Sequence, residues 1–321
     1  MDLGLSILPP DPSHAHTHTL IFLHGRGDTA RGVADTLFLS RSSTLSTLKD
    51  LLPTVRFVFP QAEMRLCERD GTDWSQWFDI WNTLDFDDRE ELQLPGLRES
   101  VLNLRRLVWR EARRVGGLDK IVLAGISQGG STAVHVLLNM GILPEEKAVG
   151  SVRERRGTKR KADELDWDAG AIDPDRMDID TGREWEAQRG LHGMTDCNAA
   201  PARLAAFIGF ACGMAFPGGS LEETREVLNL EGRPSDDIIR HTPVFLGHCV
   251  DDPLMFIEYG MLLRNTLLDF GMGVTWREYE DGGHWINSPH GIDDMVEFLV
   301  AQGIPASKPA RHRGGISVSP D

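Results

Sequence analysis

The chain of 321 residues has no long apolar run, no excess of basic residues and no closely paired cysteines. No stretch approaches the roughly 20 apolar residues that cross a bilayer, so the sequence predicts no integral membrane segment. The net charge of −15 at pH 7 argues against a nucleic-acid partner, because general nucleic-acid binders carry a basic face. The four cysteines lack a C-x-x-C pair, which is typical of free thiols in a reducing compartment: Cys67, Cys197, Cys212 and Cys249.

The N-terminus also lacks the features of a secretory signal peptide. MDLGLSILPP carries an acid at position 2, and two prolines follow its short apolar stretch. A signal peptide begins with basic residues and has a long apolar centre. We therefore expect a cytoplasmic protein.

Apolar runs typical of buried strands alternate with segments whose apolar residues recur at helical spacing. Strands are predicted at residues 19–25, 55–60, 120–126, within 203–216, and at 242–249 and 274–280. Helices are predicted at residues 29–52, 97–114, 128–140, 255–270 and 292–301. The alternation predicts a mostly parallel, doubly wound α/β sheet with helices on both faces.

Two segments do not fit a packed core. Residues 145–200 contain few apolar residues and change from basic (RERRGTKRK) to acidic (DELDWDAGAIDPDRMDID). Such a stretch cannot bury enough surface to offset the entropy of ordering it. We expect a single domain over residues 1–321 that carries a disordered insertion at 145–200 and a flexible tail at 303–321.

A serine stands between two glycines in LAGISQGGSTAVHVLL, where an apolar run gives way to a helical pattern. The motif is Gly125-x-Ser127-x-Gly129. A nucleophile on a sharp strand-to-helix turn takes a strained backbone conformation, and the flanking glycines remove Cβ atoms that would clash. Ser127 is the candidate nucleophile.

A serine hydroxyl needs a base to take its proton and an acid to orient that base. Asp251 and Asp252 follow one predicted strand, and His284 follows the next, in GGHW. Because successive side chains point in opposite directions, only one of the two acids can face the imidazole. His284 is the favoured base, and His290 is its rival on the same stretch.

The loop LHGRGDTA after the first predicted strand suits an oxyanion site, because its glycines allow a close approach to a ligand. The backbone N–H of Arg26 is the expected donor in this loop. The N–H of Gln128, the residue after the nucleophile, is expected to join it.

Seven motifs occur in order along the chain: FLHGRGDTA, FPQAEMR, WFDIWN, GLRES, LAGISQGG, GHCVDDPL and GGHW. The set resembles the acyl-protein thioesterase/lysophospholipase-like carboxylesterases, a group of α/β-hydrolases, and especially their fungal members. The resemblance covers roughly residues 18–140 and 203–301. It implies the α/β-hydrolase fold, a triad of Ser127, Asp252 and His284, an oxyanion hole at Arg26 and Gln128, and Trp77 beside the acyl group.

The chain departs from that family at several positions. The family usually has an apolar residue at position 26, so an arginine side chain is expected to change the mouth of the site. The usual HG before the acid appears as GHCV, which leaves the choice between Asp251 and Asp252 open. The insertion at 145–200 is absent from the usual pattern.

These observations predict a serine hydrolase that acts on an acyl ester or thioester, such as an acylated protein or a lysolipid, through an acyl-enzyme. No metal or organic cofactor is expected. Two alternatives remain: an esterase for small or secondary-metabolite esters, and a non-catalytic α/β-hydrolase relative that works through protein contacts. Neither the acyl length nor the oligomeric state follows from the residues, because fold alone does not decide substrate.

Overall fold

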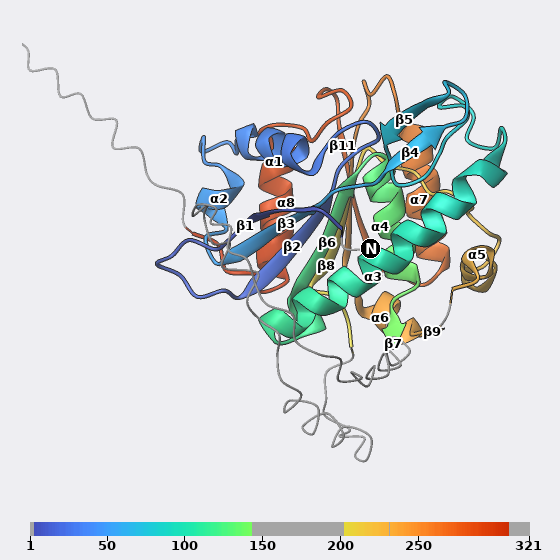
Figure 1. Cartoon of the computed structure of the whole chain (residues 1–321). Helices are drawn as coiled ribbons and strands as arrows, with labels where there is room; N and C mark the ends of the chain where they lie inside the picture. The colour runs from blue at the N-terminus through green and yellow to red at the C-terminus, as the bar shows by residue number, and fades with distance from the viewer. Residues whose placement is uncertain (1–2, 143–201, 231, 308–321) are drawn as a thin grey trace, which may run out of the picture. The chain divides into compact units, whose positions relative to one another are not determined.

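The computed structural model describes residues 3–142, 202–230 and 232–307, whose main feature is a seven-stranded sheet (Figure 1). Its strands are Leu5–Leu8 (β1), His18–Leu23 (β2), Val55–Pro60 (β3), Ile121–Ile126 (β6), Ala206–Phe210 (β8), Val244–Cys249 (β10) and Val274–Tyr279 (β11). They lie in the order β1-β3-β2-β6-β8-β10-β11. Only the β1–β3 pair is antiparallel, so the predicted mostly parallel sheet is confirmed.

Helices cover both faces of this sheet. One face carries α3 (Gln93–Val115), α4 (Gln128–Leu138), α5 (Leu221–Leu228), α6 (Asp236–His241) and α7 (Ile257–Asp269). The other carries α1 (Ala30–Leu39), α2 (Leu48–Leu51) and α8 (His290–Ala301). The described residues belong to one compact unit, whereas the predicted insertion at 145–200 and most of the tail at 303–321 lie outside them.

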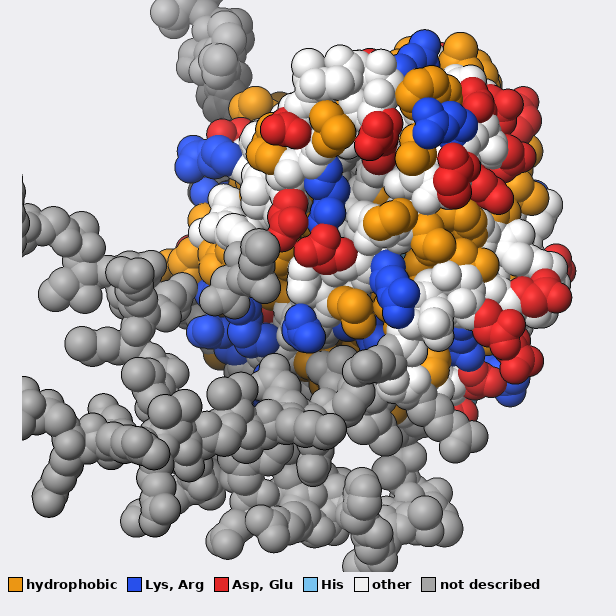
Figure 2. Space-filling view, turned by 45° about the vertical axis from the view of Figure 1, so that its right-hand side comes forward, with side chains coloured by type: hydrophobic (Ala, Val, Ile, Leu, Met, Phe, Trp, Pro, Cys, Tyr) orange, Lys and Arg blue, Asp and Glu red, His pale blue; other side chains and the backbone are white. Residues whose placement is uncertain are grey.

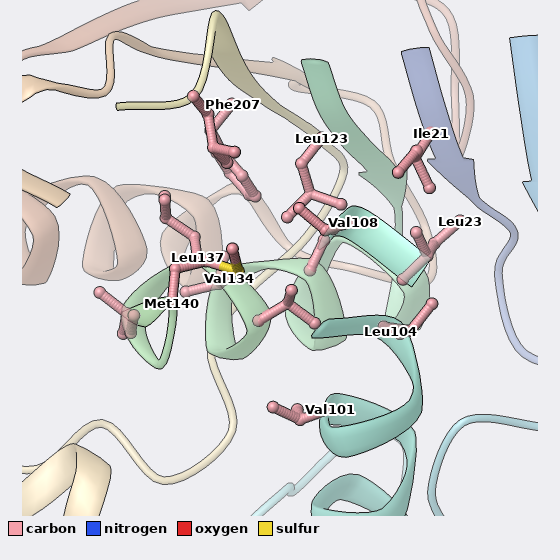
Figure 3. Close-up of a cluster of buried hydrophobic side chains, with 14 of the residues drawn as sticks. Ile21, Leu23, Val101, Leu104, Val108, Leu123, Val134, Leu137, Met140 and Phe207 are labelled. Atoms are coloured by element: carbon pink, nitrogen blue, oxygen red, sulfur yellow. The ribbon is translucent and has the colours of Figure 1, made fainter. Parts of the chain in front are cut away.

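The two faces of the sheet have separate cores because side chains alternate along each strand. Ile21 and Leu23 of β2 pack with α3 and α4, as Figure 3 shows for part of this cluster. Leu20 and Phe22 of the same strand pack on the opposite face, with α1 and α8. Strand β6 is buried along its whole length, as its near-continuous apolar run predicts.

One helix prediction was wrong. The segment 29–52 contains two helices, α1 and α2, separated by the hydroxyl-rich stretch SRSSTLST. In that stretch the Ser42 hydroxyl accepts a hydrogen bond from Ser46 N at 3.1 Å, and Leu45 has φ 60°. Serine and threonine side chains compete in this way for backbone groups that a helix would use.

The helices α5 and α6 did not emerge from the sequence patterns, and neither did three features formed by strands. The edge strand β1 is one of them, and a hairpin of Met64–Cys67 (β4) with Thr72–Ser75 (β5) is another. A third is the short antiparallel pair Gly141–Ile142 (β7) and Arg233–Pro234 (β9). The β4–β5 hairpin stands beside the loop that leaves β2, since Gly27 N donates to Ser75 O at 2.7 Å.

The connections place a crevice at one edge of the sheet. Strand β2 pairs in parallel with β3 on one side and with β6 on the other, so the chain reverses its direction of progress between β2 and β6. In open α/β sheets, ligands bind outside the carboxyl ends of strands at such a reversal. The loop from Gly25 and the turn at Ser127 begin at this place.

Acidic side chains are prominent on the face shown in the space-filling view, and apolar side chains reach the surface between them (Figure 2). The net charge of −15 at pH 7 is consistent with this surface. In the described part of the chain no helix is both long and apolar enough to cross a membrane. The cytoplasmic location stays a prediction.

The contact between α4 and β2 leads to a prediction about stability. A Cβ atom at Gly129 would lie 2.4 Å from the carbonyl oxygen of His24, whereas one at Gly273 would meet nothing within 4 Å. Gly129→Ala should therefore lower the free energy of unfolding by about 2 kcal/mol or more, and Gly273→Ala should leave it nearly unchanged. Urea unfolding of both variants checks this, and equal stabilities would contradict so close a contact.

Candidate active site

Ser127 occupies the turn between β6 and α4 in a backbone conformation that side chains rarely adopt. Its φ is 54° and its ψ is −130°. A Cβ atom at Gly125 would lie 2.7 Å from backbone atoms of Gly129 and Gly130, so this turn closes only with glycine at position 125. The Ser127 N–H donates to Phe210 O at 3.0 Å, which ties the turn to β8. These are the features expected of a nucleophile turn.

An acid and a histidine meet at the ends of β10 and β11. Nδ1 of His284 lies 2.8 Å from Oδ2 of Asp252 and 3.0 Å from Oδ1. Asp252 Oδ1 also accepts hydrogen bonds from the N–H groups of Leu254 and Met255, both at 2.9 Å. The Asp252 residue is 4% exposed, so its carboxylate is held in place almost entirely by protein groups.

Asp251 makes different contacts, which separates the two adjacent acids. Its carboxylate accepts hydrogen bonds from Gly283 N at 2.8 Å and Gly282 N at 3.3 Å, the two residues before His284. The imidazole thus faces Asp252, while Asp251 holds the backbone of the same loop. His290 is exposed at the start of α8 and does not line the cavity that Ser127 and His284 share.

The pKa of Asp252 is lower than usual, although several influences oppose one another. Burial is the largest and raises the pKa, because it disfavours a charged carboxylate. The hydrogen bonds from His284, Met255 and Leu254 stabilise the charged form and together outweigh burial. A carboxylate held ionised beside the imidazole can orient it and stabilise its protonated form.

The loop after β2 lies against the serine turn. A Cβ atom at Gly25 would be 3.4 Å from the Cβ of Ser127. Among the residues that the structure describes, no hydrogen-bond acceptor is found for the backbone N–H of Arg26 or of Gln128. Two N–H groups without partners beside a nucleophile turn are suited to binding an oxyanion.

Trp77 is not where the sequence placed it. The residue is 1% exposed and does not line the cavity, so the prediction that it contacts the acyl group was wrong. It lies behind the site instead: its indole N–H donates to His24 O at 2.8 Å, and its backbone N–H donates to the Gln128 side chain at 2.9 Å. Its ring is large enough to fill the wall between the β2 loop and α4, and its polar groups fix both.

A cavity of about 900 Å³ opens over these groups. Ser127, His284, Arg26 and Gln128 line it together, although no hydrogen bond joins Ser127 to His284 among the described residues. Apolar side chains form much of the remaining wall: Phe78, Trp81, Leu84, Phe86, Met214, Phe216, Tyr259 and Leu262. The hydrogen bond between a nucleophile and its base is often long or absent when no substrate is bound. The shared cavity is therefore the better indication that Ser127 and His284 belong to one site.

Several positioning groups were missed in the sequence patterns. His24 is fully buried; its Nδ1–H donates to Gly25 O at 2.7 Å, and its Nε2 accepts from Ala62 N at 3.0 Å. His135 on α4 contacts Ala215 O at 2.7 Å and so supports the cavity wall at 213–217. The available signal was weak: that wall directly follows a buried strand, at the edge where the other site loops begin.

The groups that line the cavity include a hydroxyl (Ser127), an imidazole (His284) and the backbone of Arg26 and Gln128. These are the parts that nucleophilic catalysis uses. Within residues 3–142, 202–230 and 232–307, no group of three or more His, Cys, Asp or Glu side chains is arranged to hold a metal ion.

The chain is similar in sequence to a known family of hydrolases and to several fungal proteins. A model of the Phospholipase/Carboxylesterase family matches residues 10–144. Acyl-protein thioesterase 1 of Cryptococcus neoformans is 31% identical over 153 residues, which are 47% of this chain and 59% of the relative. Acyl-protein thioesterase 1 of Gibberella zeae is 22% identical over 89% of this chain and 91% of the relative. The match to the first of these relatives thus spans 59% of its length.

A solved structure extends the comparison over most of the chain. The crystal structure of Zea mays acyl-protein thioesterase 2 matches with a TM-score of 0.59 and 18% identity, over 93% of this chain and 98% of that one. At this identity the likeness concerns the fold alone. The α/β-hydrolase fold and the resemblance to the acyl-protein thioesterase/carboxylesterase family, both predicted from the sequence, are confirmed.

The buried histidine in the cavity wall predicts a pH dependence of stability. Burial lowers the pKa of His135 from 6.5 to about 4. In the unfolded chain His135 becomes protonated as the pH falls below 6.5, whereas in the folded chain it stays neutral until about pH 4. The free energy of unfolding should therefore lose about 3 kcal/mol through His135 as the pH falls across this window.

Urea unfolding at several pH values between 7 and 4 measures this loss. His135→Gln should flatten the pH dependence relative to wild type, whereas the exposed His241→Gln should keep it. A His135→Gln curve parallel to that of wild type would show that this histidine does not cause the acid sensitivity.

Proposed function

We propose that this chain is a serine hydrolase that cleaves acyl esters or thioesters, with Ser127 as nucleophile, His284 as base and Asp252 as the orienting acid. The observation that carries the proposal is the meeting of three loops at one cavity. One bears a serine in a strained turn, one a buried carboxylate, and one an imidazole bonded to that carboxylate. The names of the fungal relatives support the same reaction class.

In the proposed reaction the Ser127 hydroxyl attacks the acyl carbonyl while Nε2 of His284 takes the hydroxyl proton. Nδ1 of the same ring stays bonded to Asp252, which stabilises the imidazolium that forms. The N–H groups of Arg26 and Gln128 bind the negative oxygen of the tetrahedral intermediate. His284 then gives its proton to the departing alcohol or thiol, and an acyl-enzyme remains.

The second half of the reaction uses the same groups. A water molecule loses a proton to His284 and attacks the acyl-enzyme carbonyl. The second tetrahedral intermediate collapses, Ser127 recovers the proton from His284, and the carboxylic acid leaves. No step requires a metal or an organic cofactor.

The walls of the cavity favour an acyl chain as the group bound beside Ser127. A volume of about 900 Å³ with aromatic, leucine and methionine side chains suits an apolar ligand of that size. We propose an acylated protein or a lysolipid as substrate, in a cytoplasmic setting. A non-catalytic relative would not react with a covalent serine probe, and an esterase for small esters would prefer short acyl substrates.

The nucleophile can be identified by covalent labelling. Wild type should react with a fluorophosphonate probe, and Ser127→Ala should not react. The same variant should lower kcat by at least about 10⁴-fold, because the steps that depend on the triad are lost. The matched control is His290→Ala, which changes the rival histidine and should label like wild type.

Hydrolysis of 4-nitrophenyl acetate, 4-nitrophenyl octanoate and the octanoyl thioester of N-acetylcysteamine defines the substrate class. The proposal expects kcat/KM to be higher for both octanoyl substrates than for the acetate. A preference for the acetate would favour the small-ester alternative. If wild type neither reacts with the fluorophosphonate probe nor hydrolyses any of the three substrates, only the non-catalytic alternative remains.

The two adjacent acids should differ sharply in a substitution test. Asp252→Asn should lower kcat by about 10⁴-fold, because the imidazole loses its ionised partner and its correct tautomer. Asp251→Asn keeps an oxygen acceptor for the N–H of Gly283, so a loss of less than about tenfold is expected. Steady-state kinetics on 4-nitrophenyl octanoate decides, and the reverse order of effects would reassign the acid to Asp251.

A further inference from the structure

The side chain of Arg26 is held by the β4–β5 hairpin rather than left free at the mouth of the site. Its Nε donates to Gln76 Oε1 at 2.7 Å, and one terminal nitrogen lies 3.0 Å from Cys67 Sγ and 3.8 Å from Asp79 Oδ1. Its guanidinium carbon is 4.9 Å from the centre of the Trp74 ring. Only 16% of the side chain is exposed, although its residue lines the cavity.

The partners of this guanidinium are themselves fixed. The Gln76 amide donates to the carbonyl oxygens of Arg65 at 3.2 Å and Leu66 at 3.3 Å, both on β4. Asp79 Oδ2 accepts from Glu68 N at 3.1 Å. The guanidinium therefore lies in a rigid enclosure built by the hairpin and the loop that follows it.

The loop that carries Arg26 has one other direct backbone bond to this hairpin in the described part of the chain. Gly27 N donates to Ser75 O at 2.7 Å. The second bond within the loop, from Asp28 N to Gly25 O, is longer at 3.3 Å. The side chain of Arg26 thus adds its bonds to Gln76 and Cys67 to the Gly27–Ser75 bond that holds this loop against the hairpin.

We propose that the Arg26 side chain is a positioning residue, which aims the N–H of Arg26 at the oxyanion by anchoring the loop to the β4–β5 hairpin. This inference rests on the proposed function. An arginine suits the task because its planar group donates in several fixed directions and stacks on an aromatic face at the same time. An oxyanion donor acts only when it is held before the charge develops.

Loss of the Arg26 side chain is expected to lower kcat rather than the affinity for substrate. The guanidinium donates to Gln76 and Cys67 and lies 3.8 Å from Asp79 Oδ1, so the side chain is engaged within the protein. Its loss should leave the binding of a neutral substrate largely intact. It should weaken the transition state, in which the carbonyl oxygen carries negative charge.

Arg26→Met tests the proposal, because methionine fills part of the space without donating hydrogen bonds. The matched control is Arg65→Met on β4, an arginine with 18% side-chain exposure that bonds Glu63 and Glu99 and does not touch the loop. With 4-nitrophenyl octanoate, Arg26→Met should lower kcat by about tenfold with KM within twofold of wild type, as expected for a displaced oxyanion donor. Arg65→Met should change both by less than twofold.

A second measurement separates positioning from general damage to the fold. A serine nucleophile adds to an octyl trifluoromethyl ketone and gives a tetrahedral adduct that carries an oxyanion. The inhibition constant of this ketone should therefore rise about tenfold in Arg26→Met. Arg26→Lys keeps the charge and should recover part of the loss. Thermal unfolding and fluorophosphonate titration of active sites normalise each rate to folded enzyme.

The outcomes are distinct. Wild type that fails to label with the fluorophosphonate overturns the proposed function itself. Wild type that labels, with Arg26→Met showing an unchanged kcat and unchanged ketone inhibition per active site, overturns the role of Arg26 alone. A rise in KM with kcat unchanged would also overturn it, because the side chain would then act on substrate binding.

Discussion

The close approach of the first turn of α4 to the end of β2 is the contact on which the rest of the site depends. Backbone of the two elements meets where a Cβ atom at Gly129 would lie 2.4 Å from His24 O. This contact brings Ser127 beside Gly25 and forces the serine into its unusual conformation. Such strain costs on the order of 1–3 kcal/mol, and it persists only because the surrounding packing leaves no alternative.

The contact between Asp252 and His284 depends on a second arrangement, the pairing of β10 with β11. Because these strands are parallel neighbours, their following loops leave the same edge of the sheet. Two consecutive carboxylates then hold one loop at two points: Asp252 bonds the imidazole of His284, and Asp251 bonds the backbone just before it. The buried charge of Asp252 is tolerated because hydrogen-bond donors surround it, whereas Asp251 is exposed to solvent.

The large aromatic side chains near the site have two different roles, structural support and lining of the cavity. Trp77 is buried and ties the β2 loop to α4 through hydrogen bonds, whereas Phe78 and Trp81 face the cavity. Residues adjacent in sequence thus have different places: Trp77 lies in the wall behind the cavity, and Phe78 lines the cavity. Rigid walls suit a site whose proposed oxyanion donors are backbone N–H groups, because the direction of a backbone N–H is set only by the groups that pack around it.

The sequence alone predicted the parallel strands of the sheet, the helices α3, α4, α7 and α8, and the order of the three candidate catalytic residues. Burial imposes period-two and period-3.6 patterns on residues such as those of β6 and α3, and the glycines around Ser127 reflect a turn with no room for side chains. The tertiary structure was needed to show that His284 faces Asp252 rather than Asp251, that Trp77 lies in the wall behind the cavity and that the Arg26 side chain bonds to residues of the hairpin region. Those outcomes depend on contacts between segments far apart in the chain, and local spacing carries no record of them.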